Sequence, residues 1–234
     1  MEENNTSKDL SVVQKLVGVF FSPRDSFESI DRKPDWLVPL IVVVLITLIF
    51  TMVTLPITMP EQMEKQRVKF EERGMSDDEI DQAMAMGEKI GKISGPIGAV
   101  IVVPIMLLIF ALIFWFVGNI VLGGQTTFKK MFSVYTYSSL IGMFGLLLRI
   151  PLILSKQTAD VHFSIASFLP ADQSKTFVYN ILKGFDIFAI WQYIVLAIGF
   201  AVIYKFSMKK SGWTMAVLFL ITILISAGFS QMFG

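Results

Sequence analysis

Long apolar runs alternate with short polar segments along this chain of 234 residues. A helix needs about 20 apolar residues to cross the roughly 30 Å hydrocarbon core of a bilayer, and five runs approach or exceed that length. Arg149 is the only charged residue inside any of them. The pattern therefore predicts an all-α polytopic membrane protein, a bundle of five transmembrane helices. The predicted spans are 36–56, 97–122, 131–154, 187–204 and 213–233.

The composition agrees with a chain that uses the bilayer as its solvent. Apolar residues make up 54% of the sequence and charged residues 17%, and the mean hydropathy is +0.65. That is too apolar for a single soluble core. The 20 basic and 19 acidic residues nearly cancel, so no nucleic acid partner is expected. The lipid bilayer is the first predicted partner.

The chain offers few groups for catalysis. It has no cysteine and one histidine, His162, which excludes thiolate metal sites and most designs that need a positioned imidazole. The glycine-rich nucleotide loops, the HExxH metal motif and the GxSxG nucleophile motif do not occur. We therefore predict no enzyme, no cofactor and no metal site. His162 lies in a polar loop, where we expect it to face water.

The first 35 residues, called the collar below, are polar and carry scattered charges, unlike a signal peptide. We expect them to be retained. Within 11–21 the apolar residues recur at helical spacing with Lys15 off the apolar face, which is typical of an interfacial helix. Ser22 followed by Pro23 then predicts the start of a second short helix. Residues 36–234 form the predicted transmembrane domain.

The loop 60–92, called the hairpin below, separates the first two spans. We expect one charged helix over 61–73, a break at Gly74, and a second helix that begins with a capping box of Ser76 and Glu79. A solvated connector is favoured over a lid that binds a ligand, because runs of charge usually face water.

The basic residues predict the orientation. The loops after the second and fourth spans carry two and three lysines and no acid, whereas the hairpin has six basic and nine acidic residues. Lys and Arg concentrate in short cytoplasmic loops. We therefore expect a cytoplasmic N-terminus and an extracytoplasmic C-terminus.

Three ionisable residues form a candidate intramembrane polar layer. Arg149 lies about 7 Å inside the end of its span, at 1.5 Å per residue. If the fourth helix begins near Val178, so that the span extends over 183–206, Lys183 and Asp186 lie about 7 and 12 Å in from the same face, and Arg149 can pair with Asp186. If that span begins at 187, both lie at headgroup level, where Lys183 can snorkel. Pairing or snorkelling is favoured over an ion or proton path.

Three further residues belong to the candidate set. Asn119 in the second span and Gln192 in the fourth can form hydrogen bonds between helices. Pro104 is expected to kink the second span.

Four segments resemble one known family. They are FFSPRDSFESI at 20–30, PDWLVPL at 34–40, RGMSDDEI at 73–80 and DIFAIW at 186–191. They are similar to the Yip family of Ypt/Rab-interacting membrane proteins, in its prokaryotic branch. The resemblance implies five spans, a cytoplasmic N-terminus and a bacterial inner membrane. Eukaryotic members bind Rab GTPases, but this chain lacks their longer cytoplasmic region and their Asp-Leu-Tyr-Gly-Pro motif, so a Rab-type GTPase partner is not expected.

Two functions from different classes remain open. The first hypothesis is a non-enzymatic scaffold or adaptor that presents the collar and the hairpin to membrane or cytoplasmic proteins. The alternative is a small transport or permeation protein in which Pro104, Arg149, Asp186 and Gln192 line a path. An enzyme in which one carboxylate or hydroxyl acts alone is the weakest reading.

Overall fold

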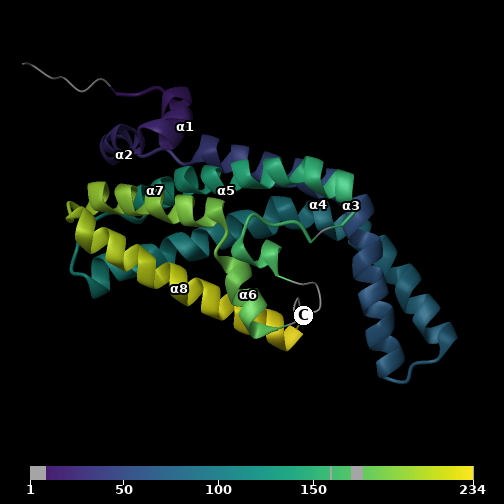
Figure 1. Ribbon diagram of the computed structural model, residues 1–234. Helices are drawn as coiled ribbons and strands as arrows, with labels where there is room; N and C mark the ends of the chain where they lie inside the picture. Colours follow the sequence, from purple (N-terminus) through teal and green to yellow (C-terminus); the bar gives the residue numbers. More distant parts are fainter. Residues whose placement is uncertain (1–8, 159, 170–175, 234) are drawn as a thin grey trace, which may run out of the picture.

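Five long helices form the body of the protein, and they lie side by side with alternating directions (Figure 1). The computed structural model describes residues 9–158, 160–169 and 176–233, so the first eight residues of the collar lie outside the described residues. The five helices are long and apolar enough to cross a membrane. The predicted all-α polytopic bundle is confirmed. The helices are α3 (Leu37–Glu72), α4 (Asp77–Phe116), α5 (Phe128–Lys156), α7 (Ile187–Tyr204) and α8 (Met208–Phe233).

Helices α5 and α7 form the centre of the bundle. Every residue over 131–141 of α5 is buried, and α7 packs against α2, α5 and α8. Four of the buried residues of α5 are serine or threonine, and each of these hydroxyls donates to the carbonyl four residues earlier, which pairs its proton away from water. These residues are Ser133, Thr136, Ser138 and Ser139.

The collar contains the two predicted helices, α1 (Val12–Phe21) and α2 (Pro23–Arg32). The expected orientation of α1 is wrong in one respect. Lys15 is buried, while Val13, Val17 and Phe21 are exposed. The reason is a long-range ion pair, described below, that draws the Lys15 side chain into the protein. The exposed apolar residues of α1 face away from the bundle.

The hairpin differs from the two short helices that the sequence predicts. Helix α3 runs without interruption through Pro56 and Pro60 to Glu72, and α4 begins at Asp77 and continues through Pro96 and Pro104. The hairpin is thus the outer part of two transmembrane helices. Figure 1 shows both helices turning sharply away from the bundle, and prolines are the usual cause of such bends.

The tip of the hairpin follows the prediction. Gly74 adopts φ 74°, a left-handed conformation that suits glycine. The Ser76 amide donates to Glu79 Oε2 at 2.9 Å, completing the predicted capping box.

The fourth span is shorter than the 183–206 alternative. A separate helix, α6 (Phe177–Gly184), ends before Asp186, and α7 begins at Ile187. The chain breaks here because the Asp186 carboxylate caps α7 and its backbone is extended, with φ −77° and ψ 137°. The last turn of the second span is a π-helix, Val117–Val121.

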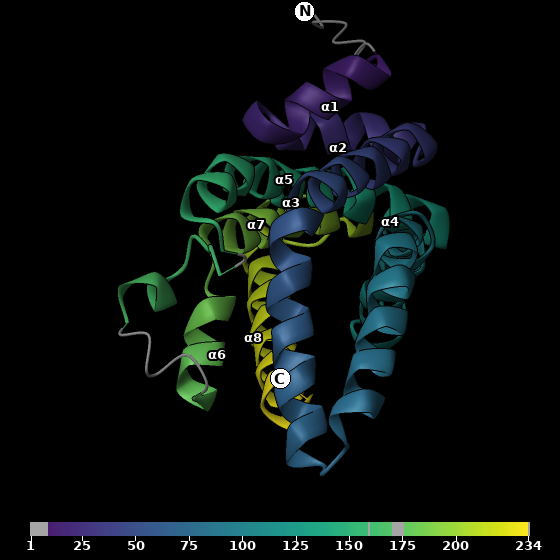
Figure 2. The same ribbon diagram turned by 90° about the vertical axis from the view of Figure 1, so that its right-hand side faces the viewer.

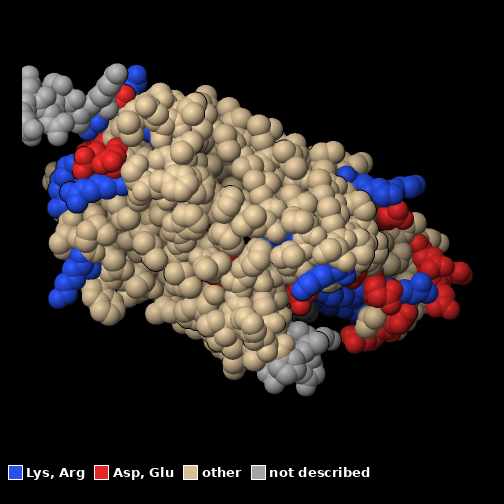
Figure 3. Space-filling model, turned by 45° about the horizontal axis from the view of Figure 1, so that its top comes forward, with Lys and Arg blue, Asp and Glu red and all other residues tan. Residues whose placement is uncertain are grey.

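Charges gather at the two ends of the protein and leave a broad band almost free of them on the face shown in Figure 3. We call the end with α1 and α2 the collar end and the opposite one the hairpin end. Figure 2 looks at the hairpin end, with α6 and the end of α8 beside the hairpin in that view.

Close helix packing predicts a specific sensitivity to added volume. A Cβ on Gly145 of α5 would lie 2.5–2.8 Å from Phe188, whereas a Cβ on Gly98 of α4 would meet nothing within 4 Å. We expect Gly145→Ala to lower the free energy of unfolding by about 1–3 kcal/mol, because the helices must separate. Gly98→Ala should be neutral or slightly stabilising. Thermal unfolding in detergent measures both, and equal effects would contradict the packing described here.

Candidate functional site

The carboxylate of Asp186 is the centre of a polar cluster at the hairpin end. Its Oδ1 accepts from the amides of Phe188 and Ala189 at 2.9 and 3.3 Å. Its Oδ2 accepts from Arg149 Nη2 at 2.6 Å and from the Phe163 amide at 3.1 Å. Asp186 is only 6% exposed. Both oxygens are therefore occupied by donors from α5, from α7 and from the loop between α5 and α6.

That loop is fixed against the start of α7. The Ile187 amide donates to the Phe163 carbonyl at 3.0 Å, and Ser164 and Asp186 form an antiparallel bridge. The Phe163 ring packs edge-on against Phe188. A short 3-10 turn, η2 (Ile165–Phe168), follows. The Arg149–Asp186 pair thus joins three segments that lie far apart in the sequence.

Lys183 does not join this pair. Its Nζ lies 3.2 Å from Asp160 Oδ1, and the same carboxylate accepts from the Tyr179 hydroxyl at 3.3 Å. Burial alone would raise the pKa of Asp160, but Lys183, His162 and the Tyr179 hydroxyl together outweigh it and hold this pKa below its usual value. The structure therefore contains two neighbouring ion pairs instead of one layer of three charges.

The expectation that His162 faces water is wrong. Its side chain is 6% exposed, its ring packs edge-on against Tyr179, and Nε2 lies 3.2 Å from the Tyr179 hydroxyl. Burial lowers the pKa of His162, and the Lys183 and Arg149 cations act in the same direction. The reason for the burial is the fold of the loop, which Asp186 fixes from 24 residues away in the sequence.

Asn119 and Gln192 lie apart from this cluster. Asn119 is in the π-helix at the collar end, where it donates to the Thr126 carbonyl at 3.0 Å and accepts from the Tyr204 hydroxyl at 2.6 Å. Gln192 packs so close to Gly142 that a Cβ there would lie 2.7 Å from its Oε1. Pro104 lies within α4. The structure does not bring these residues into one layer with Arg149.

A second polar cluster, at the collar end, is absent from the sequence-based site. Asp31 of α2 accepts from Lys130 of α5 and from Lys205 at the end of α7, both at 2.7 Å. Burial alone would raise the pKa of Asp31, but the hydrogen bonds from the two lysines lower it below its usual value. One feature of the sequence indicates this cluster. The two short loops that carry lysines contain no acid, so their lysines need carboxylate partners from another segment such as the collar.

A further ion pair fixes α1. Lys15, with a side chain 3% exposed, lies 2.9 Å from Asp35 Oδ2. The Tyr137 hydroxyl of α5 donates to the other oxygen of Asp35 at 3.3 Å. Within the collar, Arg32 also pairs with Asp9 at the surface, at 3.0 Å. The collar is thus attached to the bundle by charged contacts as well as by the buried side chains Phe27 and Ile30.

The chemistry of both clusters is ionic pairing. Among the described residues, no group of three or more His, Cys, Asp or Glu side chains is placed to hold a metal ion. The carboxylates of Asp31, Asp160 and Asp186 each lie against a cation. Such contacts orient helices and loops.

The pair at the hairpin end predicts a stability change. Arg149→Leu leaves the buried Asp186 carboxylate without its cation, and we expect a loss of about 1–3 kcal/mol in the free energy of unfolding. Asp186→Asn keeps a good helix cap but removes the charge, so Arg149→Leu should cost less in that background. Thermal unfolding of the four proteins of this double-mutant cycle measures the coupling. Additive effects would show that the pair does not stabilise the protein.

The buried histidine predicts a pH dependence. Because the pKa of His162 is lower in the folded protein than its usual value of about 6.5, the unfolded chain binds more protons as the pH falls through that value. Stability is then fully present above about pH 6.5 and declines below it. We expect the melting temperature to fall between pH 7 and 5.5, and to fall less in His162→Phe, which keeps a ring against Tyr179. Identical pH profiles would refute this assignment.

Comparison with known proteins identifies the family. The sequence model of the Yip1 domain matches residues 17–229, which is nearly the whole chain. The membrane protein YknW of Bacillus subtilis (strain 168) is 33% identical over 121 residues, a stretch that covers 51% of this chain and 50% of YknW. No solved structure matches the chain. The resemblance to the Yip family that the sequence motifs indicated is confirmed, and this chain is a membrane protein that belongs to the Yip1 domain family.

Proposed function

We propose that this protein is a non-enzymatic membrane scaffold whose collar binds a protein partner on the cytoplasmic side of a bacterial inner membrane. The observation that carries the proposal is the attachment of the collar. Asp31 contacts Lys130 of α5 and Lys205 of α7 at once, so α2 is held in one position on the two central helices. A fixed, water-facing surface is what a partner protein needs for binding without a large ordering cost.

The orientation in this proposal rests on charge. The short loops at the collar end contain or adjoin five lysines, whereas the hairpin end carries the acidic hairpin. The lysines are Lys129, Lys130, Lys205, Lys209 and Lys210. The positive-inside rule then assigns the collar end to the cytoplasm and the hairpin end to the other side. The exposed apolar residues of α1, Val13, Val17 and Phe21, suit contact with the inner leaflet beside the bundle.

Permeation is less well supported than a scaffold. The ionisable residues that would line a path bond to each other, with Arg149 on Asp186 and Lys183 on Asp160. Asn119, which belongs to the same candidate polar layer, lies at the opposite end, bonded to Tyr204. These contacts favour a structural role for the polar groups within the membrane.

Two single-cysteine variants test the proposal, since the natural chain has no cysteine. Asp25 and Asp78 are exposed acids in the first turns of α2 and α4. In intact cells, a membrane-impermeant maleimide should label Asp78→Cys, and should label Asp25→Cys only after permeabilisation. A photo-crosslinker at Asp25→Cys should then capture a distinct protein in native membranes that the one at Asp78→Cys does not.

A variant in which the collar is held less firmly on the bundle provides the control. Asp31→Asn removes the charge that holds both lysines and should reduce capture at position 25 several-fold without preventing membrane insertion. Equal capture from both cysteines would show non-specific crosslinking. If no protein is captured and the purified protein passes a solute in liposomes, the scaffold hypothesis is wrong and the permeation hypothesis takes its place.

A further inference from the structure

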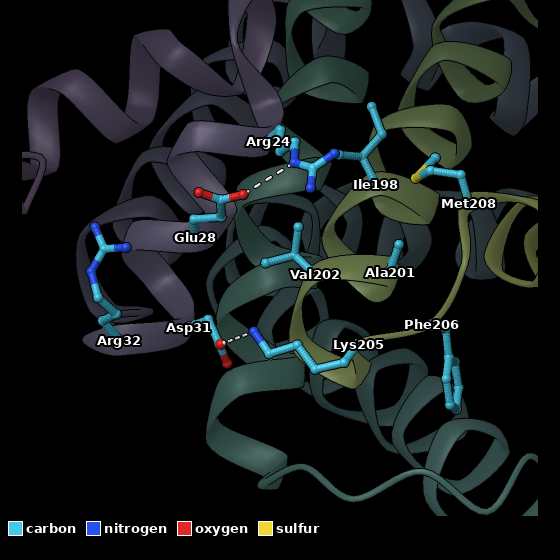
Figure 4. A pocket seen from close by; sticks show the side chains of 10 residues that line it. All are labelled: Arg24, Glu28, Asp31, Arg32, Ile198, Ala201, Val202, Lys205, Phe206 and Met208. Atoms are coloured by element: carbon cyan, nitrogen blue, oxygen red, sulfur yellow. Dashed lines mark hydrogen bonds and ion pairs between the residues drawn. The ribbon is translucent and has the colours of Figure 1, made fainter. Parts of the chain in front are cut away.

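A groove lies beneath the collar, between α2 and the end of α7 (Figure 4). It encloses about 470 Å³. One side is the polar face of α2, and the other is the last two turns of α7 with the residues that follow it. The lining residues are Arg24, Glu28, Asp31 and Arg32 from α2, and Ile198, Ala201, Val202, Lys205, Phe206 and Met208 from the other side.

The rim of the groove carries cations with unused donors. The side chains of Arg24 and Lys205 are 74% and 72% exposed although each contacts a carboxylate, Glu28 at 3.1 Å and Asp31 at 2.7 Å. A guanidinium has five N–H donors and an ammonium has three. Both side chains can therefore donate to a further anion without breaking the pairs that they form.

The surroundings of the groove are also positive. Lys210 lies over the Phe206 ring, with Nζ 3.6 Å from its centroid, and Lys130 shares Asp31 with Lys205. The cations in and beside the groove outnumber the carboxylates. The cations are Arg24, Arg32, Lys130, Lys205 and Lys210, and the carboxylates are Asp9, Glu28 and Asp31.

The α7 side of the groove, called the wall below, is apolar and extends toward the bilayer. Ile198 precedes Lys205 by seven residues, which is about 10 Å along the helix, and Ala201 and Val202 lie between them in the same wall. Since α7 is long and apolar enough to cross the membrane, this wall lies at the depth of the upper acyl chains. Lys205 at the end of this wall lies at the depth of the phosphates, and Arg24 lies farther along the groove, beside Ile198 (Figure 4).

We propose that this groove binds one anionic phospholipid. Lys205 contacts its phosphate, Arg24 donates to the ester carbonyls farther along the groove (Figure 4), and an acyl chain continues along Ile198. The charge of the rim selects an anionic headgroup, and the wall selects a molecule with a chain attached to it. A free phosphate does not use the wall, and an acidic protein segment does not reach this depth.

Native mass spectrometry of the purified full chain tests the proposal, with phosphatidylglycerol and phosphatidylcholine as probes. We expect one phosphatidylglycerol to be retained in preference to phosphatidylcholine. Arg24→Gln should weaken its binding about fivefold, the effect of one basic residue near a lipid surface. Arg67→Gln is the matched control, because Arg67 forms the same type of surface pair, with Glu71 at 3.2 Å, in the hairpin.

A substitution in the α7 wall distinguishes binding of a whole lipid from binding of its headgroup alone. Val202→Phe adds volume to the wall along which the lipid lies and should weaken phosphatidylglycerol binding while leaving the rim intact. Competition by glycerol 3-phosphate on the unchanged protein should be weak, and this measurement does not depend on the folding of any variant. Equal binding of the two lipids, equal loss in Arg24→Gln and Arg67→Gln, or full displacement by glycerol 3-phosphate would each overturn the proposal.

Discussion

A bilayer contains no water to pair with polar groups, and this constraint accounts for how the polar residues of the bundle are placed. The serine and threonine hydroxyls along the buried part of α5 bond to the carbonyls of their own helix, as Ser138 does to Val134. The one charge within a predicted span, Arg149, contacts a carboxylate that four donors satisfy in total. An unpaired group at these positions costs several kcal/mol, so each contact is needed before the helices can pack.

The five spans could be predicted because length and hydropathy do not depend on tertiary contacts. The helical hairpin was predicted in part. Its capping box at Ser76 is a local signal and was read correctly, but the continuity of α3 through Pro56 and Pro60 was not. In water these prolines end a helix, whereas in the bundle the neighbouring α4 stabilises the continuation despite the lost hydrogen bonds.

The errors in the site have a common physical cause. Asp186 looks the same in the sequence whether it is a charge inside a span or the cap that begins one, and only the contacts with Arg149 and Phe163 decide between these roles. The burial of His162 and of Lys15 was missed for the same reason, because the partners that bury them lie about 20 residues away. Local periodicity carries no information about such partners.

The two polar clusters have a joint consequence for the central helices. Asp186 at the start of α7 contacts Arg149 of α5, while Lys205 at its end and Lys130 of α5 share Asp31. Since α7 is 18 residues long, these contacts lie about 27 Å apart, so α5 and α7 are held together at both ends. Alternating access requires one group of helices to move against another, and sliding α5 past α7 would break both sets of ion pairs. A pair of helices fixed in this way suits a scaffold that must keep its collar in one place.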